Sequence, residues 1–243
     1  MPRLRQVGKD DAHPFAQAIY GALFGERDPV TDPGTATGTP GNWWTVFALV
    51  PDAFDHTTAG FQFYRSPDRV LSPKLRELGQ LRAGWAVGSQ FVFSQHCKAA
   101  RDVGWSEECI EAIPHWQVAD CFSPVERALL AYTDALAIAQ GRVPDGVFEV
   151  LHEHLSDEEI LEFTYVTATY VMHATMSRAL RLEYDDVDDP IVEIDTPGMG
   201  KTGLDVMAMA DSPVEAADSP DDTADSPVEP ADSPDDTEDS PEG

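Results

Sequence analysis

The sequence contains few cysteines and no long apolar run. Its three cysteines form no Cys-x-x-Cys pair, which argues against a disulfide framework and against a thiolate zinc site of the usual spacing. No stretch of 18 apolar residues occurs, so we expect no transmembrane helix. The first ten residues contain no apolar signal-peptide core. This is typical of a cytoplasmic protein whose thiols are reduced and mostly buried.

Basic residues are scarce as well. The chain has 16 lysines and arginines against 44 aspartates and glutamates, for a formal net charge of −28 at pH 7. Fourteen of the acidic residues follow Lys201, where no basic residue occurs, so the preceding part of the chain keeps half of that charge. Because both parts repel polyanions, we expect neither nucleic acid nor an anionic membrane as a partner.

The acidic C-terminal part is repetitive. From Ala210 onward a seven-residue unit recurs, with the triplet Asp-Ser-Pro beginning at residues 211, 218, 225, 232 and 239. Proline in every unit and the lack of an apolar seam exclude a coiled coil. Like charges without apolar side chains cannot offset the entropy of folding. We therefore predict a disordered acidic tail over residues 186–243, with a solvating role or, as the alternative, a docking or phosphorylation role.

The rest of the sequence predicts an all-α fold. Apolar residues at helical spacing indicate helices over residues 13–24, 52–65 and 157–182, and a short helix that Asn42 caps. Serines at 72, 123 and 156 are predicted N-caps, the first followed by proline and the other two in capping boxes. Gly104 and Gly141 stand where helices should end. We expect a helical bundle over residues 41–185, preceded by an N-terminal helix and loop over residues 1–40.

The last predicted helix is apolar on most of its sides. A helix of this kind is expected in the middle of a bundle or in an interface between subunits. We therefore predict a homo-oligomer.

The segment that ends at His96 contains the residues best suited to chemistry. In one straight helix Glu77 and His96 would stand roughly 28 Å apart, because each residue adds about 1.5 Å. However, Gly84 and Gly88 weaken the helix interior, and Ser89 is a good N-cap for a second helix. A turn at Gly88 would place Ser89 and His96 on one face and bring Glu77 back toward them. The result would be a carboxylate–imidazole pair for acid–base chemistry.

The same segment carries a wider pattern of residues. The pattern consists of Arg76-Glu77-Leu78, Leu81-Arg82, Trp85, Gly88-Ser89 and Gln95-His96, followed by Gly104 and residues 107–113. It resembles the core of the carboxymuconolactone decarboxylase and alkyl hydroperoxidase D-like family. Residues 43–51, 123–130 and 170–176 are similar to the segments that flank this core. The resemblance covers about residues 40–185 and implies a helical bundle of the alkyl hydroperoxidase D-like type.

The resemblance implies two possible activities. One is the cofactor-free decarboxylation of a carboxylated lactone, and the other is thiol-dependent peroxide reduction, a peroxiredoxin activity. The second uses a Cys-x-x-Cys pair at a helix N-terminus, with a glutamate upstream and a histidine downstream, which here correspond to Glu77 and His96. Ser89 and Val92 occupy the two cysteine positions. Since neither can form a thiolate, we do not expect the thiol cycle.

Our first functional hypothesis is therefore a cofactor-free enzyme acting on a small organic acid or lactone. His96 would donate or accept the proton, with Glu77 orienting it and Ser89 beside it. Arg82 or Arg76 would hold the substrate carboxylate. We also expect His173 on the last helix to face the same cavity. We expect no metal.

Two other hypotheses remain open. In one, a lone cysteine such as Cys97 supports residual peroxide chemistry. In the other, the protein is a non-catalytic helical oligomer whose acidic tail engages a basic partner.

Overall fold

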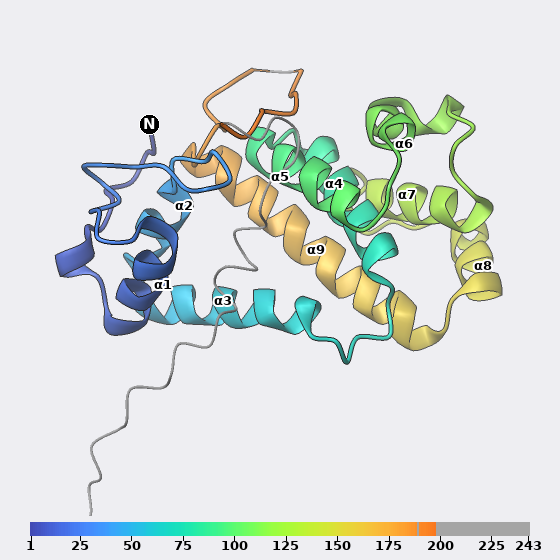
Figure 1. The fold of residues 1–243 in the computed structure, drawn as a ribbon. Helices are drawn as coiled ribbons and strands as arrows, with labels where there is room; N and C mark the ends of the chain where they lie inside the picture. The colour runs from blue at the N-terminus through green and yellow to red at the C-terminus, as the bar shows by residue number, and fades with distance from the viewer. Residues whose placement is uncertain (189, 198–243) are drawn as a thin grey trace, which may run out of the picture. The chain divides into compact units, whose positions relative to one another are not determined.

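The computed structural model describes residues 1–188 and 190–197, in which helices are connected by loops (Figure 1). No extended strand occurs within these ranges, which confirms the all-α prediction. The elements in chain order are η1 (Lys9–Asp11), α1 (Pro14–Phe24), α2 (Asn42–Phe47), α3 (Pro51–Arg65), α4 (Pro73–Val87), α5 (Gln90–Asp102), α6 (Glu107–Ala112), η2 (Ile113–Val118), α7 (Pro124–Ala137), α8 (Asp145–His154) and α9 (Asp157–Leu180). None of the helices in the described ranges is both long and apolar enough to cross a bilayer.

Three helices begin at the predicted serine caps. The Ser72 side chain accepts a hydrogen bond from the backbone of Leu75, and Pro73 is the first residue of α4. Ser123 and Ser156 each form a complete capping box, at the start of α7 and α9. Each cap satisfies backbone N–H groups that would otherwise lack a partner. These local signals therefore fix the starting points of the long helices.

The start of α2 differs from the prediction. Asn42 is the first residue of the helix rather than its cap, and Gly41 precedes it in the left-handed region with φ of 90°. The carboxylate of Glu183, from the chain after α9, accepts hydrogen bonds from the backbone N–H groups of Gly41 and Trp43 at 2.9 and 2.6 Å. A distant acid thus replaces the expected local cap.

The predicted C-terminal glycines behave differently from each other. Gly104, with φ of 88°, directly follows Val103, the C-cap of α5, as predicted. Gly141 has a left-handed backbone as well, but it lies three residues beyond Ile138, the C-cap of α7. Its N–H nevertheless donates to the carbonyl oxygen of Ala135, in the last turn of α7, at 2.9 Å, so Gly141 still helps to end the helix.

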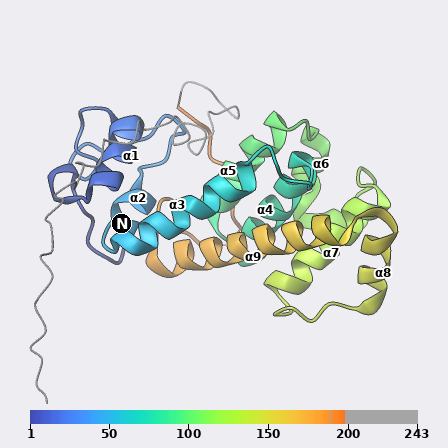
Figure 2. The ribbon, with the colours of Figure 1, turned by 90° about the horizontal axis from the view of Figure 1, so that it is seen from below.

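Helices α4 and α5 form a tight helical hairpin. Gly88 ends α4 with φ of 77° and ψ of 30°, and Ser89 then caps α5 by accepting a hydrogen bond from Val92. A side chain at Gly84 would place its Cβ 2.7 Å from the backbone nitrogen of Phe93. Only glycine therefore allows the two backbones to approach this closely. The hairpin packs against α9, drawn in gold in Figures 1 and 2, and α4 also packs against α7.

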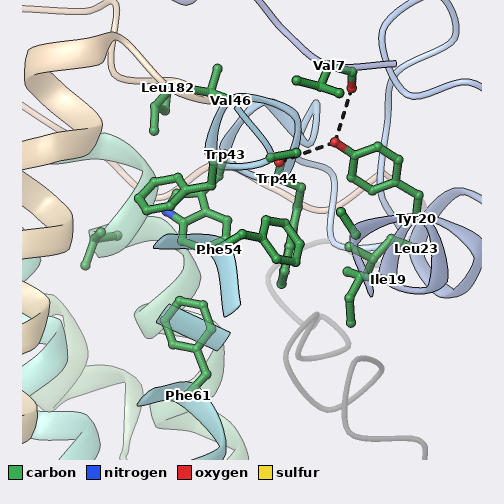
Figure 3. Close-up of a cluster of buried hydrophobic side chains, with 14 of the residues drawn as sticks. Val7, Ile19, Tyr20, Leu23, Trp43, Trp44, Val46, Phe54, Phe61 and Leu182 are labelled. Carbon is green, nitrogen blue, oxygen red and sulfur yellow. Dashed lines mark hydrogen bonds between the residues drawn. The ribbon is translucent and has the colours of Figure 1, made fainter. Parts of the chain in front are cut away.

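The N-terminal segment 1–40 packs into the same core as the helices that follow it. Tyr20 is completely buried, and its hydroxyl donates to the carbonyl oxygens of Val7 at 3.1 Å and Trp44 at 3.4 Å (Figure 3). Trp44 and Phe54 belong to the apolar cluster drawn in the same view. Residues 1–40 are therefore part of one compact unit, which extends from Met1 to Ser212, and not a separate segment.

The chain after α9 returns across α5. We call residues 190–196 the C-terminal strap, because their backbone and side chains bond to one side of that helix. The predicted acidic tail over residues 186–243 was therefore placed too early in the chain, since part of it is anchored by polar contacts that its composition does not reveal. The repeats from Ala210 onward lie outside the described residues.

Helix α9 is buried on one side only. Phe163 is fully buried and Tyr170 nearly so, but Leu161, Tyr165 and Met172 are 68, 51 and 46% exposed. Their spacing along α9 places these exposed residues on one stripe of the helix. A subunit interface along α9 would bury this stripe. The homo-oligomer itself stays a prediction.

Candidate active site

The turn at Gly88 brings Glu77 and His96 together, as the sequence predicts. Nδ1 of His96 lies 2.7 Å from Oε2 of Glu77, and both side chains are buried between α4 and α5. A carboxylate at this distance fixes the orientation of the imidazole ring and favours a proton on Nδ1. The two residues therefore form a hydrogen-bonded acid–base pair inside the protein.

The second carboxylate oxygen of Glu77 is also paired. The guanidinium of Arg76 donates to Oε1 from Nε at 3.2 Å and from Nη2 at 3.0 Å. Gln80, with its amide nitrogen turned toward the carboxylate, lies 3.0 and 3.2 Å from the two oxygens. Burial by itself raises the pKa of Glu77, but the charges and hydrogen bonds of His96 and Arg76 hold this pKa below its ordinary value. Glu77 is therefore ionised at neutral pH.

Two tyrosines complete the surroundings of His96, and the sequence alone did not indicate either of them. The ring of Tyr170 meets the imidazole edge-to-face, with centroids 4.5 Å apart. The hydroxyls of Tyr170, on α9, and Tyr64, on α3, are 2.6 Å apart. The backbone carbonyl of Tyr64 also accepts a hydrogen bond from Arg76 at 2.9 Å. Tyr64 thus connects the tyrosine pair to the acid–base pair.

His173 lies one turn after Tyr170 on α9, with ring centroids 5.7 Å apart. It is enclosed by aromatic rings, among them Phe61 at 5.2 Å and Trp43 at 6.0 Å. Within the described residues its buried Nδ1 has no hydrogen-bond partner. Burial, together with the nearby charge of His96, lowers the pKa of His173 to about 4. His173 is thus a neutral neighbour of the tyrosine and histidine cluster.

Ser89 is not part of this cluster. Its hydroxyl accepts from the backbone of Val92 and donates to the carboxylate of Asp185 at 3.2 Å. The carboxylate of Asp185 also accepts from the backbone N–H of Phe91 at 3.4 Å. The N-terminus of α5 therefore holds an acid from the chain after α9.

Arg82 points away from the acid–base pair as well. Its guanidinium donates to both carboxylate oxygens of Asp134, at 2.6 and 3.0 Å, and to the carbonyl of Ile113 at 2.8 Å. This arrangement joins α4 to α7 and to η2. Since its donors are engaged inside the protein, the geometry does not favour the predicted binding of a substrate carboxylate by Arg82.

Cys97 and Cys109 are buried, and Cys121 is partly buried. Cys97 follows His96 on α5 but is only 1% exposed. Cys109 lies on α6, and its Sγ is 3.4 Å from the carbonyl oxygen of Cys121. Burial and a hydrogen bond with Cys109 raise the pKa of Cys121 to about 12. Burial and a raised pKa both disfavour a reactive thiolate.

A cavity of about 220 Å³ lies near the turn between α4 and α5. Its lining consists of Trp85, Ala86, Val87, Gly88, Arg178, Pro190 and Ile191, and includes neither Glu77 nor His96. Across the described ranges no cluster of three or more histidine, cysteine or acidic side chains could hold a metal ion.

The comparisons with known proteins agree with this architecture. Residues 51–135, which contain α3 to α6, most of α7 and both members of the acid–base pair, match the model of the Carboxymuconolactone decarboxylase family. The uncharacterized protein YdfG of Bacillus subtilis (strain 168) is 29% identical over 92 residues, which are 37% of this chain. The chain spans only 63% of the length of that curated relative.

Several solved structures share the fold. A protein of unknown function from Agrobacterium tumefaciens, named as a candidate antioxidant defence protein AhpD, is 29% identical with a TM-score of 0.52, over 60% of this chain and 97% of that one. The alkylhydroperoxidase AhpD core of a peroxidase-related protein from Ralstonia eutropha JMP134 has a TM-score of 0.55 at 18% identity, over 75% and 95% of the two chains. The debrominase Bmp8, bound to 2,3,4-tribromopyrrole as a cysteine-to-alanine variant, has a TM-score of 0.56 at 15% identity, over 75% and 92%.

At these identities the last two structures support the fold alone. The family match covers the helical hairpin that carries Glu77 and His96. The structure from Agrobacterium tumefaciens is similar over 97% of its own length, which corresponds to 60% of this chain. Residues 51–135 of this chain thus match the carboxymuconolactone decarboxylase family, and the fold is that of AhpD-like proteins.

Proposed function

We propose that the protein is a cofactor-free enzyme that transfers a proton on a small organic acid or lactone. His96 is the acid and base, and Glu77 is its positioning residue. The observation that supports this proposal is the buried contact of 2.7 Å between Nδ1 of His96 and Oε2 of Glu77. Because Nδ1 is held by the carboxylate, Nε2 is the ring nitrogen that can exchange a proton with a substrate.

The proposed reaction is a decarboxylation through an enolate. The bond between the carboxylate carbon and its neighbour breaks, carbon dioxide leaves, and the electron pair stays on the remaining conjugated system. The imidazolium of His96 then gives its Nε2 proton to that carbanion, and solvent restores the proton. The ionised Glu77 stabilises the imidazolium before the transfer.

The arginines have other roles in this proposal than the sequence predicted. Arg76 acts through Glu77, because it neutralises the carboxylate and fixes its orientation. Arg82 stabilises the contact between α4 and α7. The aromatic side chains of Tyr64, Tyr170 and His173 instead favour a substrate with a planar, largely apolar body.

Substitution of His96 tests the proposal. We expect His96→Ala to lower turnover by 10²- to 10⁴-fold, the range for loss of a general acid or base. A panel of carboxylated lactones and unsaturated acids in heavy water allows both loss of carbon dioxide and deuterium incorporation to be followed by NMR. His154→Ala, at an exposed histidine of α8, is the matched control. Turnover by His96→Ala at the wild-type rate, in a folded protein, would contradict the proposal.

Thiol-dependent peroxide reduction is the second candidate, because several relatives are named for AhpD or peroxidases. The residues weigh against it: Ser89 and Val92 stand at the N-terminus of α5, and Cys97 is buried. A variant with Cys97, Cys109 and Cys121 all changed to serine should consume hydrogen peroxide no more slowly than the wild type. A rate that falls with this substitution would support the thiol candidate.

A further inference from the structure

Helix α5 carries a buried polar stripe on the side opposite His96. The stripe consists of Gln90, Ser94, Lys98 and Arg101, which are spaced by four, four and three residues and therefore share one face. The exposed fractions of Gln90, Ser94 and Lys98 are only 3, 0 and 4%. Polar side chains are this strongly buried only where they have hydrogen-bond partners. The C-terminal strap supplies these partners.

The stripe binds the backbone of the strap in an extended form. The side-chain amide of Gln90 pairs with both backbone groups of Val192, accepting from its N–H at 3.0 Å and donating to its carbonyl. The hydroxyl of Ser94 likewise accepts from the N–H of Ile194 at 2.9 Å and lies 3.3 Å from its carbonyl oxygen. This pairing resembles the edge of a sheet, in which backbone groups rather than side chains are recognised.

One side chain of the strap is recognised as well. The carboxylate of Glu193 accepts from both terminal nitrogens of Arg101, at 2.6 and 2.7 Å, and lies 3.8 Å from Nζ of Lys98. Lys98 also donates to the carbonyl of Ile194 at 2.6 Å. The side chain of Val192, in contrast, is 58% exposed. The stripe therefore requires a glutamate followed by a residue with a backbone N–H, in an extended segment.

The sequence contains further copies of this short pattern. Val-Glu occurs four times, and Val125-Glu126 lies in the first turn of α7. The remaining two copies stand in the acidic repeats, as Val214-Glu215-Ala216 and Val228-Glu229-Pro230. The nine residues 210–218 and 224–232 are identical except that Ala216 is replaced by Pro230. Proline has no N–H to donate to Ser94, so only the first copy meets both requirements.

We propose that the polar stripe of α5 is a docking site for extended Val-Glu segments of this chain, filled by residues 192–194 and open to exchange with residues 214–216. The exchange is between chemically similar occupants, because both offer one carboxylate to Lys98 and Arg101 and the same backbone groups to Gln90 and Ser94. Pro190 and Ile191 line the cavity beside Gly88. Replacement of the strap would therefore also remove one wall of that cavity.

Peptide binding to the full-length chain tests the proposal. The probe is a fluorescently labelled peptide of residues 210–218, and its binding is followed by anisotropy at low ionic strength. Three proteins are compared: the wild type, Glu193→Ala, and Glu193→Ala with Glu215→Ala. We expect the double variant to bind most tightly, because neither internal segment can then offer its carboxylate. Glu193→Ala alone should bind at least tenfold more weakly, since its own residues 214–216 fill the site, and the wild type should bind most weakly.

The natural pair of repeats provides the specificity control. The peptide of residues 224–232 should bind the double variant about tenfold more weakly than residues 210–218, which corresponds to the loss of one hydrogen bond. Adding Arg101→Ala to the double variant should abolish binding. Circular dichroism establishes that each variant is folded. Equal affinity of the two peptides, equal binding by the single and double variants, or no binding by a folded double variant would each overturn the proposal.

Discussion

The two faces of α5 bury polar groups by different means. The face with His96 is matched to Glu77, which is only 19 residues away in the chain. The opposite face is matched to the strap, about 100 residues away, and mainly to its backbone. One face therefore holds a fixed pair of ionisable side chains, whereas the other holds a segment that is recognised by its extended backbone and one carboxylate. The comparison indicates that the first face is specific in its chemistry and that the second is specific in its conformation.

The largest loss of stability is expected from replacing Glu77, the acid that pairs with His96. Glu77→Ala leaves the buried His96 and the partly buried Arg76 without their common partner. Loss of one member of a buried charged network costs roughly 3–5 kcal/mol. Urea denaturation followed by circular dichroism measures this loss of unfolding free energy.

The corresponding change on the second face is the control. Glu193→Ala removes an ion pair between the strap and α5 and leaves the contacts between the helices in place, so the expected cost to global unfolding is only about 1 kcal/mol. Equal costs for Glu77→Ala and Glu193→Ala would mean that the two faces do not differ as we describe.

The stability contributed by the segment between α9 and the strap should depend on pH. Burial raises the pKa of Glu183 to about 7, although backbone hydrogen bonds from Trp43 and Gly41 act in the opposite direction. The folded protein therefore takes up a proton at this carboxyl before the unfolded chain does. The stability contributed by Glu183 should increase as the pH falls from 8 toward 4.5, by up to roughly 3 kcal/mol.

Glu183→Gln isolates this contribution. Asp185, whose pKa burial raises to about 6, acts in the same direction as Glu183, while His173, with its lowered pKa, acts in the opposite direction below pH 6.5. Both are present in the wild type and in the variant, so the difference between the two proteins reports on Glu183. A difference in unfolding free energy that stays constant between pH 8 and pH 5 would contradict the expectation.

A smaller loss of stability is expected when a side chain at residue 84 pushes α4 and α5 apart. Gly84→Ala brings a methyl group against the backbone of α5 and should cost about 2 kcal/mol. Gly60→Ala in α3 is the matched control, because a Cβ at that position meets no atom within 4 Å. The control should be neutral or slightly stabilising. Thermal unfolding of both variants measures the difference, and similar melting temperatures would argue against a close contact at Gly84.

The smallest effect on stability is expected at the exposed stripe of α9. Leu161→Lys should change the unfolding free energy of a single chain by less than about 0.5 kcal/mol. If α9 forms the proposed homo-oligomer interface, the same change should convert the oligomer to monomers in size-exclusion chromatography with light scattering. Glu158→Lys, in the first turn of α9, should leave the assembly intact. A monomeric wild-type protein would refute the interface.

The features that could be predicted from the sequence are local ones. Ser72, Ser123 and Ser156 mark helix starts because a cap and its partners lie within three residues. The approach of Glu77 and His96 was predictable because one glycine and one N-cap specify the turn between them. In these cases the signal and the structure that it produces occupy the same short stretch of chain.

The features that were missed depend on distant partners. Arg82 bonds to Asp134, 52 residues later, and Tyr64 meets Tyr170 after 106 residues. Composition alone placed the strap inside a tail and Asp185 at the end of the helical domain, with no indication that both contact α5. Such partners are selected by the packing of whole helices, which no single motif records.

The short turn at Gly88 also affects the order in which contacts can form while the chain is being synthesised. Hairpins with short connections form quickly because little entropy is lost in closing them. The acid and the imidazole can therefore meet as soon as residue 102 has left the ribosome, well before α9 has been synthesised. The strap is completed only when residue 196 emerges. A nascent chain thus contains both members of the acid–base pair well before it contains the strap that covers the opposite side of α5.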